Sequence, residues 1–118
     1  MRTDVVNIKT TPDFDPKRNP RDVYIGRYHP GKPFFPRSRW QNPYKEDLSN
    51  FRRDGTRAEV IEKFRRDALG EVAPRKTPAD ILAQIPELKG KRLGCWCKPG
   101  ACHGDLLAEW ANKGVPSR

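Results

Sequence analysis

Proline placement limits where regular secondary structure can form in this chain of 118 residues. Four prolines fall between Gly26 and Gly55, at Pro30, Pro33, Pro36 and Pro43. Each lacks an amide donor and fixes φ, so neither a helix nor a strand ladder runs through this segment. We therefore predict a long loop or lid over residues 27–55, with regular elements only on either side of it. Connections longer than about 15 residues are usually functional or disordered in compact domains.

A stretch that overlaps the predicted loop, residues 17–53, carries most of the excess positive charge. The formal net charge is +9, and residues 17–53 hold ten Lys and Arg against three acidic residues. Aromatic residues are interleaved with them, at Tyr28, Phe34, Phe35, Trp40 and Tyr44. This composition disfavours disorder and is typical of a surface that binds single-stranded nucleic acid or a nucleotide. A solvated surface that only keeps a small protein soluble would have the same composition.

Hydrophobic patterns outside the loop predict strands and helices in alternation. Strands are expected at residues 5–8, 23–25 and 91–97. The capping-box spacing of Thr56 and Glu59 predicts a helix that continues to Ala68. Shorter helices are expected from Pro78 until Pro86 stops the second one, and from about residue 103 to Lys113.

This alternation predicts an α/β fold. We expect a small single-domain sandwich over residues 1–114, with a short, partly parallel sheet, about three helices and the long basic loop. Residues 115–118 are expected to form a loose tail. The chain is too short for two independent hydrophobic cores, which also favours one domain.

All three cysteines and one of the two histidines fall within residues 95–105. An odd number of cysteines, without a secretion signal, argues against a disulfide framework and for a reducing compartment. Cys95, Cys97, Cys102 and His103 are a ligand set suited to zinc, although their spacing matches structural zinc sites poorly. Zinc is therefore an alternative, and we otherwise expect no metal or cofactor.

A second interpretation makes Cys102 a reactive thiol. At a helix N-terminus, beside His103 and Lys98, its pKa would be lowered, and His103 would act as acid or base. Asp105 either takes part in this chemistry or caps the helix. A third interpretation has the helix amides near Gly100–Gly104 bind an anion, with the cysteines only lining the pocket.

A ligand site is expected where the loops after the strands converge. In a parallel sheet, Arg27, Trp40 and Asn42 would meet the Cys-His turn at the carboxyl ends of the strands. They would supply a guanidinium for an anion, an aromatic face for a ring and an amide for edge recognition. Arg39 and Lys98 are further candidate ligand-binding cations. Alternatively, these side chains satisfy loop backbone groups or belong to the core.

The C-terminal motif resembles a known family. Gly90–Cys97, Pro99 and Cys102–Glu109 look like the signature of the domain of unknown function 4326 family, small proteins of microbes and their phages. Val5–Ile8 and Val23–Arg27 agree with it, whereas Gln41 replaces a usual glycine. The resemblance implies little about activity. A further distant similarity, to a domain with a carboxylate in place of Cys97, disfavours zinc.

Three functions remain open, and whether the protein is an enzyme is left undecided. The first is binding of a nucleotide, modified base or single-stranded nucleic acid, with Cys-His chemistry. The second is a non-catalytic interaction module, such as a phage effector that binds a host protein. The third is a small zinc-stabilised binding domain. No apolar run is long enough to span a membrane, so we expect a cytoplasmic protein without a membrane partner.

Overall fold

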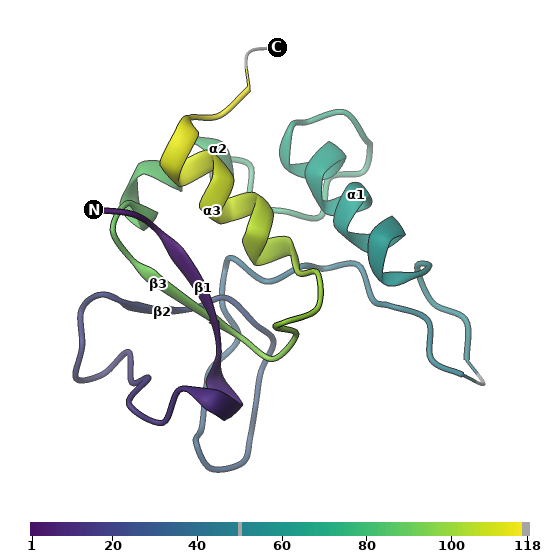
Figure 1. Ribbon diagram of the computed structural model, residues 1–118. Coiled ribbons are helices and arrows are strands. Elements are labelled where there is room, and N and C mark those ends of the chain that lie inside the picture. The colour runs from purple at the N-terminus through teal and green to yellow at the C-terminus, as the bar shows by residue number, and fades with distance from the viewer. Residues whose placement is uncertain (50, 117–118) are drawn as a thin grey trace.

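Three short parallel strands form the centre of the fold in the computed structural model, which describes residues 1–49 and 51–116 (Figure 1). Strand β3 (Arg92–Cys95) lies between β1 (Asp4–Asn7) and β2 (Asp22–Tyr24) and pairs in parallel with both. The predicted α/β class is confirmed, and the sheet is fully parallel. Strand β3 is shorter than expected and ends at Cys95, so Cys97 lies beyond it.

Side chains alternate between the two faces of this sheet, as the pleat requires. Val5, Val23 and Leu93 are in register and pack into the main core beneath the helices. Val6 and Tyr24 pack on the other face, in a smaller cluster with Phe14. A Cβ atom on Gly94 would lie 2.3 Å from Cζ of Phe14. Glycine is therefore required at this point of the central strand.

The helices begin where the capping signals predict. Helix α1 (Arg57–Ala68) has the Thr56–Glu59 capping box, in which the Glu59 amide donates to Thr56 Oγ1 over 3.2 Å. Helix α3 (His103–Lys113) lies across β1 and β3 and packs against α1 (Figure 1). Its first turn approaches the sheet closely, because a Cβ on Gly104 would lie 2.6 Å from Ile25 Cδ1.

The middle helix differs from the expectation. Helix α2 spans only Ile81–Gln84 and continues as the 3-10 helix η2 (Ile85–Leu88), so Pro86 does not end the helical segment. Proline fits there because the amides in the first turn of a helix have no intrahelical partner. The hydroxyl of Thr77 bonds to Asp67 instead of capping a helix.

The proline-rich segment between Gly26 and Gly55 is anchored at several points. Phe35 and Trp40 are buried in the two hydrophobic clusters. His29 and Phe35 form an isolated antiparallel bridge, and the Tyr44 hydroxyl donates to Asp67 over 2.6 Å. Whether any part of this segment moves as a lid stays a prediction. Residues 117–118 of the expected tail lie outside the described residues.

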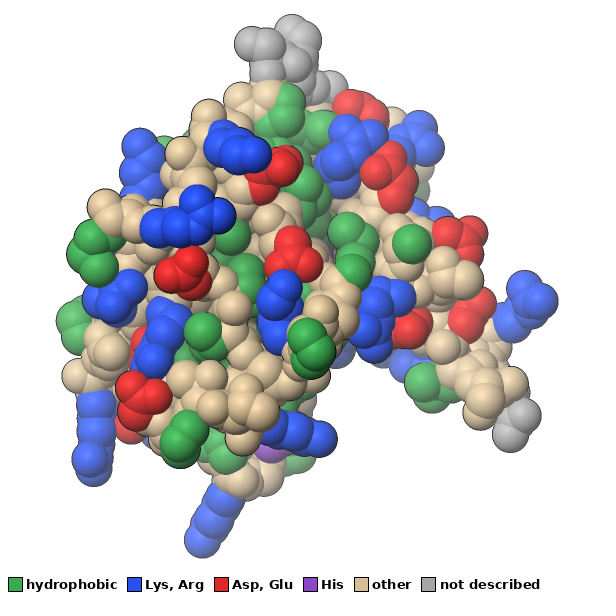
Figure 2. Space-filling view, viewed as in Figure 1, with side chains coloured by type: hydrophobic (Ala, Val, Ile, Leu, Met, Phe, Trp, Pro, Cys, Tyr) green, Lys and Arg blue, Asp and Glu red, His purple; other side chains and the backbone are tan. Residues whose placement is uncertain are grey.

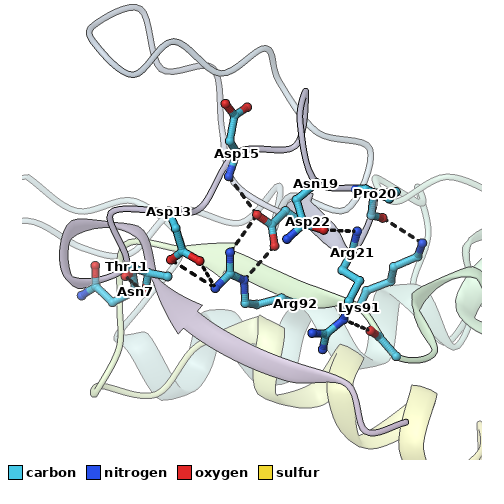
Figure 3. Close-up of polar contacts among 11 residues, drawn as sticks. Asn7, Thr11, Asp13, Asp15, Asn19, Pro20, Arg21, Asp22, Lys91 and Arg92 are labelled. Carbon is cyan, nitrogen blue, oxygen red and sulfur yellow. Dashed lines mark hydrogen bonds and ion pairs between the residues drawn. The ribbon is translucent and has the colours of Figure 1, made fainter.

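A buried ion pair joins the amino ends of two strands (Figure 3). Arg92 donates to both carboxylate oxygens of Asp22, from Nε over 2.7 Å and from Nη2 over 2.9 Å. The Asp22 side chain has no exposed surface. Burial alone would raise the pKa of this carboxyl, but hydrogen bonds from Arg92 and the Asp15 amide outweigh it, and the pKa is lowered. The same bonds raise the pKa of Arg92.

Candidate functional site

A cleft of about 480 Å³ opens at the carboxyl ends of β2 and β3. Its walls come from the residues after these strands, the 42–46 and 53–61 segments and the start of α3. Figure 2 shows the molecule hollowed between its body and the arm that precedes α1. Open α/β sheets usually bind ligands at this end of the strands. Its volume lies within the range of small-molecule sites, roughly 300 to 1,000 Å³.

The cleft brings together some of the predicted site residues. Arg27, Asn42, Cys102 and His103 all line it, as does Cys95. These five come from three separate parts of the sequence. The convergence expected from a parallel sheet is therefore found for this subset, although their roles in binding or catalysis remain predictions.

Four other candidates lie elsewhere. Trp40 is buried in the main core, and Arg39 pairs with Asp80 at the start of α2. Lys98 pairs with Asp105 over 2.8 Å, and both line a separate, smaller pocket beside β1. The position of Lys98 was not predictable from the sequence, because its contact with Asp105 depends on how the turn after β3 folds against α3.

Arg27 and Asn42 are both engaged in holding the loop. Arg27 donates from Nη2 to the carbonyl oxygens of Asn42 and Tyr44, each over 2.9 Å. Asn42 donates to the Val60 carbonyl over 3.0 Å and accepts from the Tyr44 amide over 2.9 Å. Burial lowers the pKa of the Arg27 guanidinium. Asn42 thus fixes the loop to α1, whereas Arg27 holds two loop carbonyls and contributes a cation to the cleft.

His103 is oriented by two backbone carbonyls. Its Nε2 lies 2.8 Å from the oxygen of Trp40 and 3.1 Å from that of Ile25. Carbonyls accept only, so Nε2 carries the proton, and the lone pair of the neutral ring stands on Nδ1. Nδ1 lies 3.8 Å from Cys102 Sγ. Burial lowers the pKa of His103 and keeps the ring neutral.

The three thiols form one cluster in the cleft. Cys95, Cys97 and Cys102 are free cysteines, and each interacts with the other two through side-chain hydrogen bonds. Hydrogen bonds from Cys102 and Cys97 lower the pKa of Cys95 to about 2. The interaction with Cys95 raises the pKa of Cys102. The pKa values of the two buried thiols are thus shifted in opposite directions, downward for Cys95 and upward for Cys102.

Cys102 also caps helix α3. Its sulfur accepts from the Gly104 amide over 3.3 Å, and Asp105 accepts from the Cys102 amide over 3.1 Å. The predicted lowering of the Cys102 pKa by the helix N-terminus is wrong, because the buried contacts with Cys95 and Cys97 outweigh the helix dipole. Asp105 completes the capping box and accepts a hydrogen bond from Lys98. Of the two roles considered for Asp105, this is the structural one, the helix cap.

No group of three or more His, Cys, Asp or Glu side chains in the described part of the chain is arranged to hold a metal ion. The alternative zinc ligands Cys95, Cys97, Cys102 and His103 all line the cleft, but their side chains are not arranged to hold a metal ion. Zinc binding stays a prediction. Among residues 1–49 and 51–116, no helix is both long and apolar enough to cross a membrane.

Several cleft residues were missed from the sequence. Arg53 and Arg57 flank the start of α1 and line the cleft, as do the rings of Tyr28, His29 and Trp96. A Cβ on Gly100 would lie 2.1 Å from Arg57 Nη1, so this guanidinium reaches across to the turn before α3. The signals in the sequence were the capping box at the start of the helix and the basic loop before it. They predicted where the helix begins but not that Arg53 and Arg57 line a cleft.

The buried Asp67 was also missed. It accepts hydrogen bonds from the Tyr44 and Thr77 hydroxyls, both over 2.6 Å, and from the amides of Lys76 and Thr77. Burial would raise its pKa, but these bonds lower it. Burial and the bond to Asp67 raise the pKa of Tyr44 to about 12. Asp67 therefore fixes the loop wall of the cleft to α1.

A parallel sheet with thiols and guanidinium groups at its carboxyl end defines a small α/β protein with a ligand-sized cleft. The sequence model of the family described as "Domain of unknown function (DUF4326)" matches residues 6–113. The chain belongs to this family, which confirms the resemblance of its motif.

Two viral relatives are similar in sequence. The "Uncharacterized 12.4 kDa protein in nrdA-td intergenic region" of Enterobacteria phage T4 is 39% identical over 59 residues, covering 50% of this chain and 52% of the relative. The "Uncharacterized protein R718" of Acanthamoeba polyphaga mimivirus is 35% identical over 97 residues, covering 75% of this chain and 65% of the relative. The chain thus spans less than two thirds of either relative. No solved structure matches significantly.

Proposed function

We propose that the cleft binds a nucleotide. The observation that carries this is the presence of guanidinium groups and aromatic residues in one cavity. The cleft is lined by Arg53 and Arg57 and also by Tyr28 and Trp96. Guanidinium groups bind phosphate in a bidentate manner, and aromatic faces stack on bases.

Size and charge favour a single nucleotide over a nucleic-acid strand. A volume of about 480 Å³ accommodates one nucleotide, whereas a strand is followed by a continuous positive groove. On the face shown in Figure 2, Lys and Arg side chains are interspersed with Asp and Glu instead of forming such a stripe. We therefore assign the positive charge of the loop to phosphate binding at the mouth of the cleft, and not to contacts along a nucleic-acid strand.

The thiols and His103 supply the chemistry of the cleft floor. The Nδ1 lone pair of His103 faces Cys102, and the pKa of Cys95 in the same cleft is lowered. A thiolate beside a bound ring is a nucleophile, and a neutral imidazole within reach can accept a proton. We infer that any reaction of the bound base or sugar uses Cys95 or Cys102.

Calorimetric titration with nucleoside monophosphates tests this function, with inorganic phosphate as a further ligand. We expect binding of at least one nucleotide, and an affinity reduced by about tenfold for each variant Arg53→Ala and Arg57→Ala, because each loses a charged hydrogen-bonding group. Arg65→Ala is the matched control, since Arg65 lies on the same helix and pairs with Glu62.

Three results would contradict the proposal. One is no binding of any nucleotide at millimolar concentration. Another is equal losses in Arg57→Ala and Arg65→Ala, which would assign the effect to overall charge. The third is tight binding of oligonucleotides without binding of mononucleotides, which would favour a nucleic-acid strand.

A further inference from the structure

The thiol cluster differs from an ordinary set of buried cysteines in the exposure of its members. Cys95 and Cys102 are each 3% exposed, whereas Cys97 is exposed to solvent at the turn after β3. All three line the cleft. A reagent in solution can therefore reach one sulfur, and the other two cysteines line the same cleft.

We propose that Cys97 and Cys102 form a reversible disulfide by exchange with a low-molecular-weight disulfide. Cys97 is the point of entry and Cys102 resolves the mixed disulfide. This property is independent of the proposed nucleotide binding, because it concerns the sulfur atoms alone.

The choice of Cys102 as partner follows from chain geometry. Cys97 and Cys102 stand on either side of the turn formed by residues 98–101, in which the Gly100 amide donates to the Cys97 carbonyl over 2.8 Å. This turn brings the two chain segments together. Cys95 and Cys97 are separated by a single residue, a short link that closes a disulfide ring only with strain, whereas four residues link Cys97 to Cys102.

The exchange takes place in two balanced steps. The Cys97 thiolate attacks one sulfur of the small disulfide, so a Cys97–sulfur bond forms and a small thiolate leaves. Cys102 then attacks the Cys97 sulfur and expels the second small thiolate. Its proton passes to Nδ1 of His103, which lies 3.8 Å from the sulfur, and then to the released thiolate. Overall, two cysteine thiols are oxidised, one small disulfide is reduced, and two protons end on the released thiols.

Oxidised glutathione is the probe, with intact-mass spectrometry as the readout. We expect the wild-type protein to lose the mass of two hydrogen atoms and to recover it with reducing agent. Cys102→Ser should stop as a glutathione adduct, and Cys97→Ser should react much more slowly. Cys95→Ser is the matched control and should still form the disulfide. Circular dichroism checks that each variant is folded.

Differential alkylation of the wild-type protein locates the bond without any variant. After oxidation, free thiols are alkylated in denaturant, the disulfide is reduced, and the released thiols receive a second label. We expect Cys95 to carry the first label and Cys97 and Cys102 the second. A wild-type protein that forms no intramolecular disulfide, or a disulfide that includes Cys95, would overturn the proposal.

Discussion

The two ends of the parallel sheet are built from different chemistry. At the amino ends, a buried carboxylate and a guanidinium satisfy each other, with Asp22 fully enclosed beside Arg92 (Figure 3). At the carboxyl ends, guanidinium groups and thiols surround an open cleft. The charges of Asp22 and Arg92 are paired with each other within the fold. Arg53 and Arg57, in contrast, are exposed to solvent. The same residue type is therefore buried in an ion pair at one end and exposed in a cleft at the other.

The largest expected effect comes from breaking the amino end. Arg92→Ala would leave the Asp22 carboxylate buried without its partner, and this should lower the free energy of unfolding by about 3 to 5 kcal/mol. Urea denaturation measures the loss. Arg18→Ala removes an exposed partner of Asp15 and should cost less than about 1 kcal/mol. Equal losses in the two variants would contradict a special role for the buried pair.

A smaller loss is expected from the residue that fixes the cleft wall. Asp67→Asn replaces one acceptor oxygen by a donor facing other donors, and should lower the free energy of unfolding by roughly 2 to 3 kcal/mol. Tyr44→Phe removes one of the same hydrogen bonds and should cost about 1 kcal/mol. If Tyr44→Phe cost as much as Asp67→Asn, the other three bonds of Asp67 would contribute nothing.

The cleft arginines should contribute little to stability. Arg57→Ala removes an exposed side chain whose partner Glu46 lies 3.4 Å away, so the free energy of unfolding should change by less than about 0.5 kcal/mol. Urea denaturation of this variant beside Arg92→Ala compares the two ends directly. A loss of several kcal/mol in Arg57→Ala would show that the carboxyl end is also a structural ion-pair site.

The two ends should also respond to different pH ranges. The pKa of His103 is lowered from 6.5 by burial, so the unfolded chain takes up a proton first and stability falls as the pH drops below 6.5. The pKa of Asp22 is lowered from 3.8, so its contribution is present above that pH and is lost below it. Urea midpoints from pH 8 to 3 measure both ranges. His103→Gln should remove the decline near pH 6, and its persistence would assign that decline to other groups.

The sequence predicted the scaffold better than the site. Thr56 and Glu59 indicated the start of α1 because capping is local chemistry, and the hydrophobic patterns indicated an α/β fold. The place where Arg27, Asn42 and the Cys-His turn meet followed from parallel-sheet geometry alone. These features depend on neighbours in sequence or on the topology of the sheet.

Features that depend on distant side chains were not predictable. Asp22 and Arg92 are 70 residues apart, and nothing in the local sequence of either indicates a buried pair. Trp40 and Tyr28 stand in the same aromatic loop, yet the first is in the core and the second lines the cleft. The pKa of Cys102 depends on two other sulfurs, so its position at a helix start indicated the wrong direction.

The strand order has a consequence for biosynthesis. Strands β1 and β2 are not neighbours, and each pairs only with β3, which begins at Arg92. During translation, therefore, no strand of this sheet can pair until most of the described chain has been made. Pairing over such long sequence separations slows folding. The segment that closes the sheet is followed directly by the remaining cysteines, so a nascent chain acquires all of its thiols only as it becomes able to fold.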